Sequence, residues 1–251
     1  MKRANHGFTL IELSIVLVIV GLLAGGVVTG QYLIKQAELN SILTDLGKFK
    51  AAYVQFQSTY GGKPGDLKDA ETYFGTDVNG CSSTVRTPRM TTCNGNGDNL
   101  ISVSESWRAW QQMAAAELVE GAYSGVGGSG GASHAAPGEN QPAGRLRNSG
   151  YYLVSFNPGS SAANYFAPAV ISEALFFGGE TSASWTSTPL LTPRQQEQLD
   201  RKFDDGKPGT GSMYSLKSPL NPNCTLNDLQ TTDYRLIYPG AACTLVYLLE
   251  Y

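Results

Sequence analysis

The first thirty residues constrain this chain most, because a short basic leader precedes a long apolar run. From Phe8 to Val28, Glu12 is the one charged residue among 21. A helix of that length rises about 30 Å, which matches the hydrocarbon core of a bilayer. The run is longer than the apolar region of a secretory signal, and its small residues Ala24–Gly26 lie inside it rather than after it. The sequence therefore predicts a membrane-spanning helix.

Glu12 is the unusual residue of this span. A carboxylate inside a spanning helix costs about 2 to 3 kcal/mol, and such residues usually have a partner. The span contains no Lys, Arg or His, so the partner must come from elsewhere. Cleavage after Gly7 would create an ammonium at Phe8, which a neighbouring copy could offer to Glu12. Lys2 and Arg3 place the N-terminus in the cytoplasm and the remaining chain outside it.

The segment Gly7-Phe8-Thr9-Leu10-Ile11-Glu12 and its apolar run resemble the N-terminal segment of type IV pilins and type II secretion pseudopilins. The resemblance implies that a prepilin peptidase cuts after Gly7 and methylates Phe8. It also implies that Glu12 pairs with the N-terminal amine of a neighbouring subunit. The implied partners are other pilin or pseudopilin subunits, the peptidase and the inner-membrane assembly platform. The implied location is the bacterial inner membrane with a periplasmic head, and afterwards a filament.

The helix is expected to continue beyond the membrane. After Gln31, apolar residues recur at intervals of three and four, the spacing of one helix face. These residues are Leu39, Ile42, Leu43, Leu46, Phe49, Tyr53, Phe56 and Tyr60. The Gly-Gly-Lys-Pro segment at 61–64 ends the helix. The chain then divides into a leader over 1–7, an assembly helix over 8–30, an amphipathic continuation over 31–60 and a periplasmic head over 61–251.

The head is expected to be an antiparallel sheet with extra short helices, so that the whole chain is α+β. Runs of aromatic and β-branched residues predict strands. The predicted strands are 151–156, 169–171, 174–177, 234–238 and 244–249. Periodicity predicts a helix over 105–119, a capping box at Thr192 predicts another, and one more short turn is expected over 66–74. The Gly, Ala and Ser-rich segment 121–150 is interpreted as a flexible, unstructured loop.

Four cysteines lie beyond the span, in a compartment where disulfides persist. Three pairings are possible, and short loops favour Cys81 with Cys93 and Cys224 with Cys243. A zinc site is the competing interpretation, but neither pair has C-x-x-C spacing.

The segment 94–105 has the ligand spacing of an EF-hand-like calcium loop. The candidate ligands are Asn94, Asn96, Asp98, the carbonyl of Leu100, Ser102 and Glu105. Asn94 replaces the usual first aspartate, and Asn99 replaces glycine at the turn, where asparagine tolerates left-handed backbone. A polar turn stapled by a Cys81 to Cys93 bridge is the alternative.

Asp204 and Asp205 are weaker metal candidates. Adjacent carboxylates at the end of a helix oppose its dipole and suggest a nearby cation. A solvated turn explains the same residues.

Charge and residue content argue against nucleic-acid binding and catalysis. The formal charge of −3 becomes −5 once Lys2 and Arg3 are removed, and no basic block is present. His6 would leave with the leader, and His134 has no carboxylate near it in the sequence. No G-x-S-x-G or H-E-x-x-H motif occurs. We therefore expect a structural subunit, in a minor role because of its large head. The alternative is a filament-tip module that binds a surface, cargo or DNA.

Overall fold

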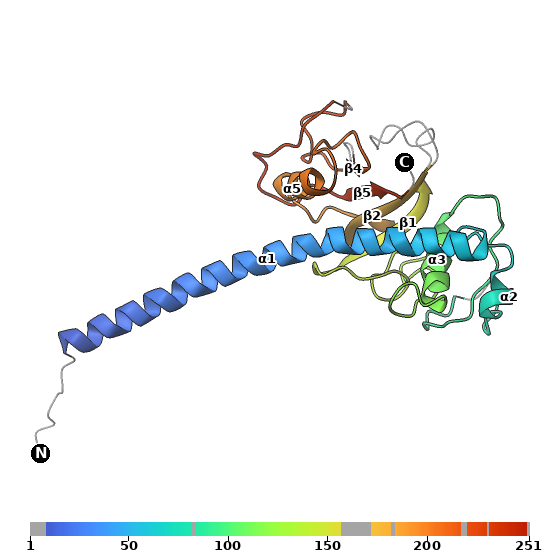
Figure 1. The fold of residues 1–251 in the computed structure, drawn as a ribbon, viewed down its shortest axis with the longest axis horizontal. Coiled ribbons are helices and arrows are strands. Elements are labelled where there is room, and N and C mark those ends of the chain that lie inside the picture. Colours follow the sequence, from blue (N-terminus) through green and yellow to red (C-terminus); the bar gives the residue numbers. More distant parts are fainter. Residues whose placement is uncertain are drawn as a thin grey trace, which may run out of the picture. The chain divides into compact units, whose positions relative to one another are not determined.

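The computed structural model describes residues 9–81, 84–156, 172–181, 184–216, 220–229 and 231–249. Its fold is α+β, as predicted, and its two compact units comprise residues 1–40 and 41–251. The elements in chain order are α1 (Leu10–Tyr60), α2 (Ala70–Phe74), α3 (Val103–Ala115), β1 (Ser149–Phe156), β2 (Ser172–Thr181), β3 (Ser184–Thr188), α5 (Pro193–Phe203), β4 (Met213–Ser215) and β5 (Leu245–Leu248) (Figure 1).

Helix α1 confirms the predicted periodicity. Within the second unit its apolar positions are at most 1 % exposed at Ile42, Leu46, Tyr53 and Phe56. The helix ends at Gly61, whose φ of 71° is left-handed and whose N–H donates to the Gln57 carbonyl at 2.9 Å. A glycine there avoids the steric cost of left-handed backbone, which is a common way to end a helix.

The sheet is antiparallel, with strand order β1-β2-β5-β4, and β3 pairs with β2. Side chains alternate between the two faces of a sheet. On one face Tyr151 contacts α1, with its ring 4.9 Å from that of Phe49, where Figure 1 shows the later part of α1 crossing β1 and β2. The opposite face buries Trp107, Tyr152, Phe156, Phe176, Val246 and Leu248. The sheet is therefore packed on both faces.

The predicted strands over 151–156, 174–177 and 244–249 are confirmed by β1, β2 and β5. The predicted strand over 234–238 is wrong. Only Tyr234 makes a β-bridge, and two turn hydrogen bonds follow, from Leu236 to Tyr234 and from Tyr238 to Arg235. The predicted strand over 169–171 lies outside the described residues. The short strands β3 and β4 were not anticipated.

The two shorter predicted helices are present. Helix α3 begins at Val103, two residues before the expected start, because Ser102 and Glu105 form a capping box. The predicted cap at Thr192 is confirmed at the start of α5, where its hydroxyl accepts the Gln195 N–H at 3.2 Å.

The interpretation of 121–150 as a flexible, unstructured loop needs correction. The segment lacks helices and contains only the start of β1, but several of its polar side chains are buried and hydrogen-bonded. Asn140 is fully buried, donates to the carbonyls of Val126 and His134, and accepts the Ala136 N–H. His134 also lies 3.0 Å from Glu180, a carboxylate 46 residues away. Side-chain bonds to the backbone therefore fix a segment that lacks apolar periodicity.

Both favoured disulfides are present, Cys81–Cys93 and Cys224–Cys243. No free cysteine remains. Each closes a short loop.

Two glycines allow the turn after α1 to cross the predicted calcium loop and α3. A Cβ on Gly65, whose φ is 85°, would overlap the carbonyl oxygen of Glu105. A Cβ on Gly95 would overlap the backbone of Asp66. The close approach of these backbones therefore requires glycine on both sides of the crossing.

Substitution of Gly65 should test this crossing. Gly65→Ala is expected to lower the free energy of unfolding by about 2 to 4 kcal/mol, because left-handed strain and overpacking combine. The measurement is chemical denaturation of the full chain in detergent micelles. The matched control is Gly47→Ala on α1, where a Cβ meets nothing within 4 Å and helix propensity should improve. Equal stability of the two variants would contradict the account.

Candidate functional site

The N-terminal segment places Glu12 at the start of α1, where it caps its own helix. Its Oε2 accepts the backbone N–H of Thr9 at 2.8 Å and the Thr9 hydroxyl at 2.7 Å, and the hydroxyl oxygen accepts the N–H of Glu12 at 3.2 Å. Both bonds go to one carboxylate oxygen, so Oε1 can accept a further donor. The predicted cleavage residues Gly7 and Phe8 lie outside the described residues.

The apolar side chains on both sides of Glu12 in the sequence are exposed in this single chain. They are 50 to 87 % exposed at Leu10, Ile11, Leu13, Ile15, Val16, Leu17, Val18, Ile19, Val20, Leu22, Leu23, Val27 and Val28. Such a surface is stable only against lipid or other apolar surfaces. The helix is apolar and long enough to cross a membrane.

In the head, Asp66 organises the predicted calcium loop. Its side chain is nearly buried, and its carboxylate accepts the N–H groups of Gly97 at 2.6 Å, Asp98 at 3.1 Å and Asn99 at 2.8 Å. Burial raises the pKa of Asp66, and the charges of Glu105 and Asp98 add to the rise, against the effect of the loop N–H bonds. Sequence reasoning missed Asp66, although Gly65-Asp66 directly follows the helix-ending turn.

The structure brings some predicted ligands together and separates others. The side-chain amide of Asn96 donates to the Asp98 carboxylate at 2.9 Å, and the backbone N–H of Asp98 donates to the Asn96 side-chain oxygen at 2.9 Å. Glu105 accepts the N–H of Asn96 at 3.2 Å and that of Ser102 at 2.9 Å. Asn99 has a φ of 66°, so the predicted left-handed turn is confirmed. Leu100 follows, and its N–H donates to Asp98 at 2.9 Å.

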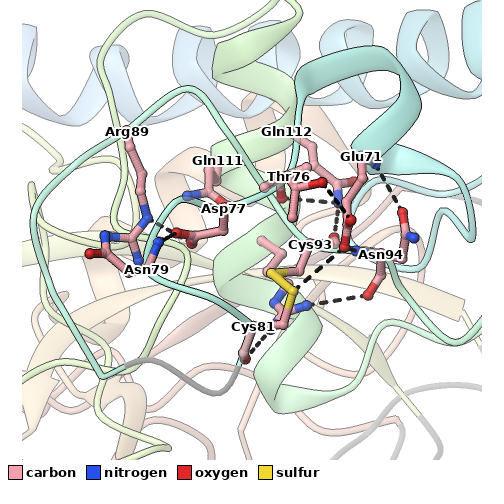
Figure 2. The surroundings of a disulfide bond; sticks show 12 residues. Glu71, Thr76, Asp77, Asn79, Cys81, Arg89, Cys93, Asn94, Gln111 and Gln112 are labelled. Atoms are coloured by element: carbon pink, nitrogen blue, oxygen red, sulfur yellow. Dashed lines mark hydrogen bonds and ion pairs between the residues drawn. A yellow bond between two sulfur atoms is a disulfide. The ribbon is translucent and has the colours of Figure 1, made fainter.

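Asn94, the first candidate ligand, bonds to Glu71 of α2 (Figure 2). The Asn94 side-chain oxygen accepts the Glu71 N–H at 2.9 Å, and the Asn94 N–H donates to the Glu71 carboxylate at 3.3 Å. The same carboxylate accepts the Thr76 hydroxyl at 2.8 Å beside the Cys81–Cys93 bridge. The disulfide and Glu71 therefore fix the start of the loop.

Gln112 of α3 joins the loop to the turn after α1. Its side-chain oxygen accepts the Gly65 N–H at 2.6 Å, and its amide donates to the Cys93 carbonyl at 3.3 Å. Nearby, Arg89 and Asp77 form a nearly buried ion pair at 2.7 Å (Figure 2). The polar groups around the disulfide are thus largely bonded.

A second acidic group lies at the end of α5. Carboxylate oxygens of Asp200, Asp204 and Asp205 all lie within 4.8 Å of one another. Asp200 is fully buried, accepts the Tyr234 hydroxyl at 2.6 Å and the Gly206 N–H at 3.0 Å, and has its pKa raised to about 7 by burial. Asp204 and Asp205 were weaker metal candidates in the sequence. Asp200, their buried neighbour, was missed.

The donor chemistry of both groups suits a hard cation, since calcium prefers carboxylate and amide oxygens. In the 94–105 loop, Asn96, Asp98, Glu105 and the unpredicted Asp66 would hold it. There the carboxylates accept backbone N–H groups, and they do not form a cluster as tight as that of Asp200, Asp204 and Asp205. Calcium binding therefore stays a prediction for both groups.

Comparison with known proteins identifies the N-terminal segment. Residues 2–28 match the prokaryotic N-terminal methylation motif, the signal of type IV pilins and pseudopilins. This range contains Gly7, Phe8 and Glu12. No curated protein and no solved structure matches the chain.

If the head binds calcium, the ion should raise its melting temperature. At a tenfold excess over the dissociation constant, binding contributes about 1.4 kcal/mol, equivalent to a rise of about 3 to 6 °C. The measurement is thermal unfolding of the full chain with calcium and with a chelator.

Two near-isosteric variants distinguish the candidate groups. Asp98→Asn should abolish the shift if the 94–105 loop binds calcium, whereas Asp205→Asn should abolish it if the α5 turn does. An identical melting curve with calcium and chelator would show that both segments are ordinary turns.

Proposed function

We propose that this chain is a prepilin-like structural subunit of a type IV pilus or a type II secretion pseudopilus. In this proposal a prepilin peptidase removes residues 1–7 and methylates Phe8, and the subunit then enters the filament from the inner membrane. The methylation motif over 2–28 is the observation that carries the proposal. The chain is the substrate of the peptidase and performs no chemistry of its own.

The exposed apolar surface of α1 supports assembly through helix packing. The other 20 residues of the span around Glu12 include no Lys, Arg or His. Among the described residues, the Oε1 atom of Glu12 has no hydrogen-bond partner. The ammonium of the methylated Phe8 of a neighbouring subunit would donate a hydrogen bond to this Oε1 atom. In apolar surroundings a charge-assisted bond of this kind is strong and directional. Pairing would therefore set the register between neighbouring helices.

The size of the second unit supports a minor role. It spans residues 41–251 and carries both disulfides. A head of that size, repeated along a shaft, would have to fit between many neighbours. A filament-tip module that recognises a surface, cargo or DNA is the second candidate, and the same head size favours it. In both cases the head is periplasmic before assembly.

Neutralisation of Glu12 tests the proposed pairing. Glu12→Gln is expected to leave membrane insertion unchanged, because it removes a charge from the span. Incorporation into filaments should fall at least about tenfold, since a charge-assisted bond contributes about 1.5 to 3 kcal/mol. The measurement is the ratio of filament-bound to membrane-bound protein in cells.

The matched control is Glu38→Gln, which neutralises the next carboxylate along α1, outside the apolar run. It should incorporate normally. Normal incorporation of Glu12→Gln would refute the pairing. An equal loss of filament incorporation in both variants would show that the net charge of the chain, rather than a specific pair at Glu12, causes the effect.

A further inference from the structure

A cavity of about 260 Å³ opens between α3, the segment 125–132 and the residues Cys81, Thr84 and Arg86. Its walls include two arginines from separate segments, Arg86 and Arg108, together with the indole of Trp107. None of the described residues that line it is an Asp or a Glu. The cavity therefore carries two positive charges without a carboxylate in its lining.

Arg108 is held in place by backbone groups rather than by an acid. Its guanidinium donates to the carbonyls of Asn94 at 3.2 Å and Cys81 at 3.0 Å. Among the described residues no carboxylate forms an ion pair with it. Burial lowers the pKa of Arg108, while the more distant charges of Asp77, Glu105 and Glu71 raise it. A guanidinium has five N–H groups, so it retains donors for a ligand.

Arg86 approaches the cavity from the other side. Its Nε donates to the Gly127 carbonyl at 3.2 Å. Its nearest acid is Glu139, at 3.8 Å, with both side chains more than a third exposed. The ion pair is long, and the Glu139 Oε1 atom that forms it is buried and accepts no hydrogen bond. An incoming anion would therefore share Arg86 with Glu139, using the guanidinium N–H groups that the Gly127 carbonyl does not occupy.

The rest of the cavity is lined mainly by small and apolar residues, with hydroxyl groups at Thr84 and Ser104. The Trp107 ring is fixed because its N–H donates to the Ala132 carbonyl at 3.0 Å, and Val126 lies on the same wall. A Cβ on Gly127 would overlap the backbone of the 131–132 turn, so this wall has no room for a side chain. At about 260 Å³ the space is smaller than most small-molecule pockets, which start near 300 Å³. It suits a single side chain with an apolar stem and an anionic end.

We propose that this cavity binds a single glutamate side chain of a partner protein. The carboxylate would lie between the two guanidinium groups, whose planar donors match its geometry. The methylene groups would pack on Val126, beside the buried ring of Trp107. Glutamate fits better than aspartate because its longer stem reaches both the arginines and the apolar wall. The inference concerns the head alone and holds whether or not the chain assembles through Glu12.

The test uses the full chain in detergent micelles at about 0.15 M salt, where diffuse attraction is screened. The probes are the peptides acetyl-Gly-Glu-Gly-amide and acetyl-Gly-Gln-Gly-amide. Binding is followed through the indole N–H resonance of Trp107, assigned with Trp107→Phe. We expect the Glu peptide to shift this resonance saturably with a dissociation constant of about 1 mM, typical of a single anchor. The Gln peptide should not shift it.

Arg86→Gln should raise the dissociation constant of the Glu peptide at least about tenfold, the usual effect of losing a hydrogen bond to a charged group. Arg86 is preferred to Arg108 because Arg108 also holds two backbone carbonyls and its removal could unfold the loop. The control is Arg145→Gln, an exposed arginine outside the cavity, which should bind like the unaltered chain. Melting temperatures verify that both variants are folded.

Three results would overturn the proposal. The first is equal binding of the Gln peptide. The second is equal weakening by Arg145→Gln, which would indicate diffuse electrostatics. The third is the absence of a saturable shift up to about 50 mM peptide, well above the expected dissociation constant.

Discussion

The carboxylate of Asp66, which accepts three successive N–H groups of the 97–99 loop, is the interaction on which the head most depends. It ties the turn that ends α1 to a segment about thirty residues further along. The neighbouring Lys63 donates to Glu173 of β2 at 2.5 Å and to the Asn99 carbonyl at 2.8 Å, in a buried ion pair. Removing one partner of such a pair leaves an uncompensated buried charge. The end of α1, the loop and the sheet are therefore fixed together.

Glycine and the disulfide make this arrangement possible. The backbones at Gly65 and Gly95 approach too closely for any side chain. The Cys81–Cys93 bridge restricts the conformations of the unfolded chain. It also holds the start of the loop beside Glu71. The same rigidity fixes Arg108 against the carbonyls of Cys81 and Asn94, so the polar groups around the bridge also shape the cavity. One set of contacts thus supports both the loop and the proposed binding surface.

The N-terminal half of α1 has the opposite character. Its apolar side chains are exposed and Glu12 is bonded only to Thr9 among the described residues. In the proposed filament, neighbouring helices would cover this surface. The carboxylate would then bind an ammonium in addition to capping its own helix. Such an assembly requires an exposed apolar helix that neighbouring subunits can cover, and this half of α1 provides one.

Features with local causes could be predicted from the sequence. Helix α1 follows from a 3.6-residue period, the cap of α5 from Thr192 and Gln195, and the disulfides from short loops. Asp66 and Asp200 could not be predicted, because the loop N–H groups that bond to Asp66 and the Tyr234 hydroxyl that bonds to Asp200 lie more than thirty residues away in the sequence. The residues 234–238 have strand composition, yet Tyr234 bonds to buried Asp200 and the chain then turns. The segment 121–150 lacks periodicity and is fixed instead by Asn140 and His134.

The most direct test of the central claim is mass spectrometry of the N-terminus of the protein purified from cells. The account predicts that the mature chain begins at Phe8 and carries one added methyl group on its amine. In cells without prepilin peptidase, the chain should retain residues 1–7 and lack the methyl group. A chain that keeps Met1 in the presence of the peptidase, or one cut near Ala24, would contradict the account.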